Sequence, residues 1–306
     1  MTDTVSLIPN QGWDSRILVC RCGTLVDTFI VVSERYVVLI DTLINTRTAK
    51  ALLEIAREYL QGRQLLAVNT HADWDHAWGN HLFDGPGAVL PAPIIGTRLC
   101  AERLRSDEAR RKLATMRAAE PGRFDDVVLT PPSLLFEQRL VIEGGDLTLD
   151  LFATPGHRAD HIAVFIPEIR TLLPGDAAEL PFPFVDSAAT MPAMRESLAR
   201  MAALQPETAL YCHAPVDSGP GLLQQNMAYF DTIEQRCRAA LARNPDEWRG
   251  GVPGTPAANA DVEALVGFPF ADALPAGADA AALEGFYRPG HQAAIRAMLG
   301  HLTSDE

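Results

Sequence analysis

The stretch THADWDH, residues 70–76, places four side chains of metal-ligand type just beyond the short apolar run LLAV, residues 65–68. These are His71, Asp73, Asp75 and His76. Histidine and carboxylate side chains both coordinate divalent cations. In open α/β sheets, bound molecules and ions usually lie at the carboxyl ends of the strands. The six positions 71–76 cannot supply all the ligands of two metal ions. A metal site here therefore requires further ligands from strand ends elsewhere in the chain.

Three more ligand-type residues stand in the same context. His157 follows the strand-like LTLDLFAT in a Pro-Gly-His turn, Asp176 follows TLL in a Gly-Asp turn, and His213 follows ALYC. If those strands share a sheet, all seven side chains converge on one pocket at its edge.

The rest of the chain alternates strand and helix patterns, which indicates an α/β class. We expect strands at 17–22, 24–33, 36–41, 65–70, 89–95, 139–142, 147–154, 162–167, 171–176 and 209–213, and helices at 46–60, 97–119, 192–204 and 222–243. We therefore expect a main domain over residues 1–244 and a helical C-terminal extension, 245–306, packed on it. A lid, a packing appendage and a homodimer contact all remain open as roles for that extension.

The composition excludes some classes of partner. The formal charge is −13 without a Lys/Arg-rich run, so nucleic acid and anionic membrane are not expected as partners. The start of the chain lacks signal-peptide character, and apolar runs stay short of the ~18 residues that span a bilayer. Five scattered cysteines suit a reducing cytoplasm. We expect a cytoplasmic protein that acts on a small-molecule substrate.

With these motifs in this order, residues 17–240 resemble the metallo-β-lactamase superfamily. Its members carry His-x-His-x-Asp-His after a strand, then a His, an Asp and a last His in the turns described above. The resemblance implies a four-layer αββα sandwich with a binuclear metal site along one edge. It also implies that His71, Asp73 and His157 bind one metal, that Asp75, His76 and His213 bind the other, and that Asp176 bridges them.

One position departs from the motif, because Asp73 replaces the usual second histidine. The flavodiiron branch of the superfamily is similar in having a carboxylate there. An extra anionic oxygen shifts metal preference towards iron or manganese relative to zinc. We expect two divalent metal ions and still favour zinc over iron and manganese. Asp73 is expected either to bind metal itself or to contact a residue that does.

The resemblance implies a metal-dependent hydrolase. A metal-bridging hydroxide attacks an ester, lactone, thioester, amide or phosphoester, and Asp75 is the expected catalytic residue that orients the nucleophile and takes up its proton. The candidates for substrate binding near the ligands are Trp74, Arg158, His161, Phe182 and Phe184. The alternatives are core packing for Trp74, a structural role in the loop for His161, and an exposed surface arginine for Arg158.

Two other functions remain open. Asp73 motivates a non-hydrolytic di-iron redox protein similar to the flavodiiron proteins, although the chain has no recognisable flavodoxin-like domain. A degenerate binding module is the other alternative, and the complete ligand types at the remaining six positions argue against it. The other histidines, His81, His291 and His301, are expected to be hydrogen-bonded structural residues.

Overall fold

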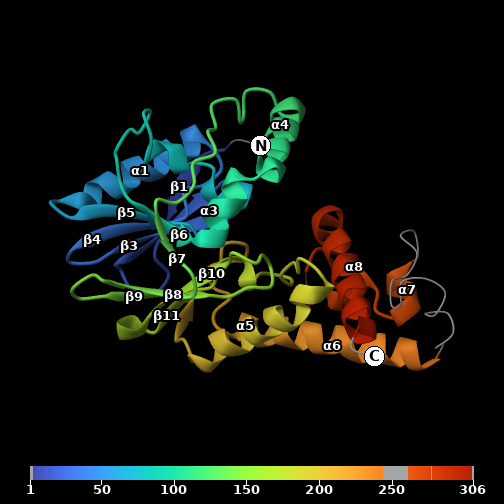
Figure 1. The fold of residues 1–306 in the computed structure, drawn as a ribbon. Helices are drawn as coiled ribbons and strands as arrows, with labels where there is room; N and C mark the ends of the chain where they lie inside the picture. The colour runs from blue at the N-terminus through green and yellow to red at the C-terminus, as the bar shows by residue number, and fades with distance from the viewer. Residues whose placement is uncertain (1–2, 244–260, 277, 305–306) are drawn as a thin grey trace. The chain divides into compact units, whose positions relative to one another are not determined.

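The computed structural model describes residues 3–243, 261–276 and 278–304 (Figure 1). They form two compact units, each described here by itself. Unit 1 draws on residues 1–153, 160–175 and 206–219, and unit 2 on residues 154–159, 176–205 and 220–306. Within the described ranges, no helix combines the length and the apolar character needed to cross a bilayer.

Unit 1 contains a seven-stranded sheet with its strands in chain order, β1 to β7. Neighbours from β1 to β4 pair antiparallel, and those from β4 to β7 pair parallel. The strands are Val5–Ile8, Ile17–Cys22, Val26–Val32, Tyr36–Ile40, Gln64–Val68, Ile94–Thr97 and Leu134–Phe136. The sequence did not predict β1 or β7, and β6 lies at Ile94–Thr97 rather than at 89–95.

A five-stranded sheet, also in unit 1, has the order β12-β11-β10-β9-β8. Its strands, from β8 to β12, are Arg139–Glu143, Thr148–Ala153, Ile162–Ile166, Thr171–Leu173 and Thr208–Ala209. Residues of both sheets, including Val19, Leu39, Leu151 and Val164, share one apolar core. The expected strand 209–213 is wrong in its extent, because β12 ends at Ala209 and His213 lies in the turn beyond it.

Helix α1, Thr46–Leu60, forms where the apolar stripe predicted it and packs against β4. Asn45 caps its first turn, since the Asn45 side chain accepts a hydrogen bond from Thr48 N and the Thr48 hydroxyl accepts one from Asn45 N. The short elements α2, Trp74–Ala77, η1, Asn80–Leu82, and η2, Pro167–Ile169, also belong to unit 1.

The single helix expected at 97–119 is in fact two helices, α3, Arg98–Arg105, and α4, Asp107–Ala119. Ser106 breaks it, because its backbone is extended and its hydroxyl accepts a hydrogen bond from Ala109 N at 3.1 Å. Serine competes with helical hydrogen bonding in this way, and Asp107 and Glu108 then suit the first turn of the new helix.

Unit 2 is helical. It contains α5, Met191–Ala203, α6, Gly221–Arg243, α7, Val262–Val266, α8, Ala280–Ser304, and the short η4, Ala188–Thr190, and η5, Phe270–Ala273, while η3, Gly175–Ala177, follows β11. Helix α6 packs against α5, α7 and α8 (Figure 1). The expected domain boundary at 244–245 lies outside the described residues, so it stays a prediction.

Candidate metal centre

The THADWDH loop of unit 1 begins two residues after β5 and ends in α2, so it starts from the carboxyl end of a buried strand. Thr70 O accepts a hydrogen bond from Ile162 N of the second sheet at 2.9 Å, which anchors the start of the loop. His71 and His76 are fully buried, and Asp75 is nearly so. The loop therefore holds its ligand-type side chains inside the unit.

Two of these side chains form a compact group with His213, which lies beyond β12. Asp75, His76 and His213 each offer one ligand atom, and the three atoms lie within 4.8 Å of one another. Asp75 Oδ2 is 3.7 Å from His76 Nε2 and 3.5 Å from His213 Nε2. The structure thus places His213 beside the loop residues Asp75 and His76, and its role as a metal ligand stays a prediction.

Two more lie beside them, since the His71 and His76 rings have centroids 4.2 Å apart and His71 Nε2 is 3.9 Å from Asp73 Oδ2. These spacings are too long for hydrogen bonds. Two atoms bound to one tetrahedral cation at about 2.0–2.2 Å are about 3.3–3.6 Å apart. The nitrogen and oxygen atoms of unit 1 are therefore spaced much as a divalent cation requires, and the residues fit such an ion.

The ring tautomers also fit a metal. His213 Nδ1 lies 3.0 Å from Leu25 O, an acceptor, so Nδ1 carries the proton and the lone pair is on Nε2. His76 Nδ1 likewise donates to Asp41 Oδ2 at 2.8 Å. The Thr70 hydroxyl donates its one hydrogen to Asp41, so His71 Nδ1, 3.0 Å from that hydroxyl, must donate to it. All three Nε2 atoms are thus in the form that binds cations.

Asp41, which the sequence analysis did not single out, organises this arrangement. It follows β4 directly, is 1% exposed, and accepts hydrogen bonds from Thr70 N and the Thr70 hydroxyl, both at 2.7 Å. Burial raises the pKa of the Asp41 carboxyl, and the bonds from His76 and Thr70 oppose that rise. Its position after an apolar strand is the signal that could have identified it.

Unit 2 holds His157 and Asp176, whose Nε2 and Oδ2 atoms are 3.7 Å apart. His157 Nδ1 lies 3.2 Å from Phe184 O, which again leaves the lone pair on Nε2. Gly156 makes the preceding turn, because its φ is +145° and an added Cβ would lie 2.4 Å from Met194 Cα. The Pro-Gly-His sequence therefore has a steric reason as well as a chemical one.

The expected substrate contacts fall into two groups. His161 and Phe182 are fully buried: the His161 ring lies 5.0 Å from that of His71, and Phe182 stacks on Tyr229 at 4.2 Å. Neither side chain has exposed surface that a substrate could contact in this structure. The partly exposed ones are Trp74, which contacts Trp78 and Phe124 edge-on, Arg158, which pairs with Asp186 at 2.8 Å, and Phe184.

Two other histidines are structural, as expected. His291 is buried in unit 2, with Nδ1 3.0 Å from the Tyr229 hydroxyl and Nε2 2.9 Å from Phe268 O. His81 contacts the Thr46 hydroxyl at 2.7 Å and Trp78 O at 3.2 Å. Both rings are thus engaged by neighbouring protein groups.

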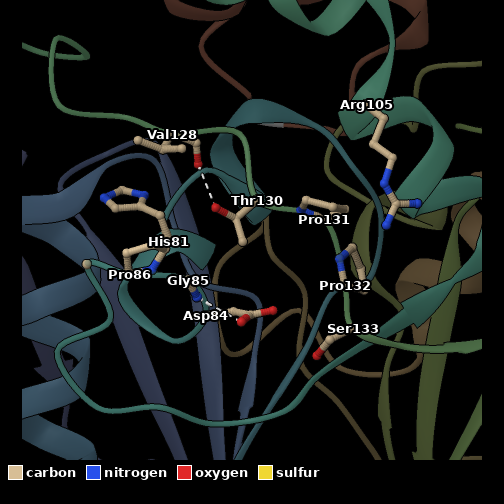
Figure 2. A pocket seen from close by; sticks show the side chains of 11 residues that line it. His81, Asp84, Gly85, Pro86, Arg105, Val128, Thr130, Pro131, Pro132 and Ser133 are labelled. Atoms are coloured by element: carbon tan, nitrogen blue, oxygen red, sulfur yellow. Dashed lines mark hydrogen bonds between the residues drawn. The ribbon is translucent and has the colours of Figure 1, made fainter.

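His81 also borders a pocket of 340 Å³ in unit 1 (Figure 2). Its walls carry apolar and proline side chains, including Val128, Pro131 and Pro132, and none of the seven expected metal ligands. Its two charged residues, Asp84 and Arg105, do not pair across it. The pocket is therefore not part of the candidate metal centre.

A sequence model of the metallo-beta-lactamase superfamily matches residues 23–213, more than half of the chain. A search of curated proteins found no match. A metallo-beta-lactamase family protein from Thermus thermophilus is 21% identical with a TM-score of 0.59, over 98% of this chain and 92% of that one.

Two other solved structures are similar. A metallo-beta-lactamase from Pontibacter korlensis is 19% identical with a TM-score of 0.55, over 74% of this chain and 98% of that one. An archaeal metallo-beta-lactamase superfamily protein from Sulfolobus tokodaii is 18% identical with a TM-score of 0.53, over 68% of this chain and 80% of that one. At such identities the likeness shows the fold, and it confirms the αββα class with a helical C-terminal region expected from the sequence.

Proposed function

The chain belongs to the metallo-beta-lactamase superfamily, and we propose that it is a metal-dependent hydrolase. The observation that carries the proposal is the set of protein contacts that orient the four histidine rings. In His71, His76, His157 and His213 the Nδ1 atom contacts a protein oxygen, so the lone pair is on Nε2, which lies 3.5–3.9 Å from a carboxylate oxygen. Histidines that ligate metals are typically oriented by such partners.

We extend the proposal to the full set suggested by motif order. His71, Asp73 and His157 would hold one divalent ion, Asp75, His76 and His213 the other, and Asp176 would bridge the two. The grouping of Asp75, His76 and His213 within 4.8 Å supports the second of these shells. Zinc is the proposed metal, because imidazole predominates in the set.

The proposed chemistry is hydrolysis. Divalent cations, when bound, polarise the bond to be cleaved and make water acidic enough to act as a nucleophile near neutral pH. Asp75 would orient that water and accept its proton, since its Oδ2 atom lies among the ring nitrogens of His76 and His213. The hydrogen bond to Asp41 would hold the His76 ring in one orientation during the reaction, with its Nε2 atom beside Asp75.

The proposed substrate is a small carboxylic or phosphate ester, with lactone, thioester and amide bonds as further members of the range. The net charge of −13 supports a small molecule over nucleic acid. All five cysteines lie in the described residues, are buried and form no disulfide, which supports the proposed cytoplasmic location.

A substrate panel tests the proposal. The protein, loaded with Zn²⁺, Mn²⁺ or Fe²⁺, would be assayed with nitrophenyl carboxylic esters, phosphomonoesters, phosphodiesters, lactones and acyl thioesters. We expect turnover of at least one class, a loss on the order of 100-fold or more in His76→Ala, and near-normal turnover in His81→Ala, a matched substitution outside the site. Activity that survives in His76→Ala would refute the assignment.

A second function is favoured by one observation, the carboxylate at position 73. A di-iron redox protein similar to the flavodiiron branch would purify with iron and show visible absorption that changes on reduction. The proposed hydrolase would be colourless with zinc. Metal analysis and a visible spectrum of freshly purified protein separate the two, and a metal content near zero after growth with all three metals would exclude both.

A further inference from the structure

Arg103, on α3, joins two carboxylates of unit 1. Its Nη2 atom donates to Asp73 Oδ1 at 2.9 Å, and its Nη1 atom donates to Asp160 Oδ1. Asp160 is fully buried, and its other oxygen accepts a hydrogen bond from Ala72 N at 2.8 Å. The guanidinium is therefore tied to the ligand loop twice, directly at Asp73 and through Asp160 at Ala72.

The helix that carries Arg103 is itself fixed to the same place. Thr97 caps α3, and its hydroxyl donates to Asp160 O at 3.1 Å. An arginine side chain stays cationic in proteins, and the bonds to Asp73 and Asp160 hold that of Arg103 in place. Arg103 is thus a fixed positive charge rather than a mobile surface group.

We propose that Arg103 is a positioning residue of the metal centre: it fixes Asp73 as a ligand through one oxygen and cancels the charge that Asp73 adds. This rests on the proposed function, in which Asp73 binds metal. With Oδ1 held by Arg103, Oδ2 is the atom on the side of His71, 3.9 Å from its Nε2. Arginine suits this task because its planar fork binds two acceptors at once.

The charge balance has a consequence for the choice of metal. The usual motif has a neutral histidine where this chain has Asp73, and the pair of Asp73 and Arg103 is neutral as well. A carboxylate that is already bound to a guanidinium is a weaker anionic ligand than an isolated one. The expected shift towards iron or manganese is therefore reduced, which favours zinc.

The competing explanation is that Arg103 serves only Asp160 and the packing of α3. The two explanations differ in how a change at residue 103 depends on residue 73. A purely structural arginine affects the protein equally whether or not Asp73 is present. A positioning arginine affects metal binding only while Asp73 is there to be positioned.

A double-mutant cycle tests this on the full-length protein, with Zn²⁺ affinity measured by competition against a chromophoric chelator. Arg103→Lys keeps the charge but loses the fork, and we expect Zn²⁺ to bind about tenfold more weakly. In the Asp73→Ala background the same change is expected to alter affinity by no more than about twofold. Arg98→Lys, an exposed arginine of the same helix, is the matched control and should leave affinity unchanged.

A second measurement uses the wild-type protein alone, so it does not depend on whether a variant at position 103 folds. In the wild-type protein, the guanidinium NMR signals of Arg103 should move when Zn²⁺ is added, and those of Arg98 should not. An equal effect of Arg103→Lys in both backgrounds, no effect in either, or an unmoved Arg103 signal would overturn the inference while the hydrolase proposal stands. A wild-type protein that binds no Zn²⁺ would overturn both.

Discussion

Replacing Asp41 by asparagine exchanges one carboxylate oxygen for an NH₂ group. The change should move the proton of two histidine rings from Nδ1 to Nε2. Asp41 Oδ1 accepts from Thr70 N, and Oδ2 accepts from both the Thr70 hydroxyl and His76 Nδ1. An amide has one oxygen and one NH₂ group, which can only donate. If the oxygen stays at Thr70 N, the NH₂ group faces two groups that were donors.

Both of those groups must then become acceptors. His76 moves its proton from Nδ1 to Nε2. The Thr70 hydroxyl turns its hydrogen towards His71 Nδ1, 3.0 Å away, so His71 also carries its proton on Nε2. The opposite amide orientation places NH₂ against the Thr70 N–H in a fully buried site, which costs about 1–3 kcal/mol. A protonated Nε2 cannot bind a cation in either ring.

The expected loss of Zn²⁺ affinity is about 10–100-fold, which corresponds to about 1.4–2.7 kcal/mol. The backbone is not a complication, because Asp41 has a φ of 73° and asparagine tolerates this left-handed region as well as aspartate does. Competition with a chromophoric chelator measures the affinity, and ¹⁵N NMR of the imidazoles in metal-stripped protein reports the tautomers.

A matched control is Glu263→Gln in unit 2. Glu263 is also a buried carboxylate with several donors, Phe270 N, Arg288 and Gln292. This change should lower stability and leave Zn²⁺ affinity as it was. The reasoning would be refuted if Asp41→Asn bound Zn²⁺ within about twofold of wild type, or if its histidines kept the proton on Nδ1.

Three other predictions concern stability. Removing metal with a chelator should lower the melting temperature by several degrees, because metal at 100 times its Kd contributes about 2.7 kcal/mol; an unchanged melt would count against the centre. Gly156→Ala should lower the free energy of unfolding, measured in urea, by about 2 kcal/mol or more, because the new Cβ would lie 2.4 Å from Met194 Cα at a φ of +145°. An unfolding midpoint equal to that of wild type would show that the turn adapts. Burial lowers the pKa of His291, so on acidification the unfolded chain takes up a proton at this histidine before the folded state does. The free energy of unfolding therefore decreases as the pH falls below about 6.5, by at most about 1.4 kcal/mol per pH unit. Between pH 7 and 5.5 the His291→Gln variant should lose less stability than wild type, and equal losses would contradict this.

Local sequence signals explain which elements could be predicted. Helix α1 has both an apolar stripe and a capping asparagine, and its predicted bounds of 46–60 agree with the structure. The unpredicted strands β1 and β7 are short, lie at the two edges of their sheet and keep exposed residues, so no clean alternation marks them. The break at Ser106 was missed because the charged pattern runs on through it.

The same distinction applies to the site. Residues after apolar strands could be found from the sequence, and Asp41 has that context too, directly after YVVLI. Arg103 and Asp160 could not be found in this way. They are 57 positions apart, and their contact depends on how α3 lies beside the loop that precedes β10. No periodicity or motif spacing encodes such a contact.

Strand register connects these two kinds of residue. Strands β4 and β5 pair in parallel with Ile40 opposite Val68, and Asp41 N donates to Val68 O at 2.7 Å. The carboxyl ends of both strands therefore coincide, which sets Asp41 beside Thr70 and within reach of His76. A slip of one residue in this pairing would turn Asp41 to the other face of the sheet and separate it from both. The orientation of His76 thus depends on the pairing of β4 and β5, so we expect substitutions in these strands to disturb the proposed metal centre without altering any ligand.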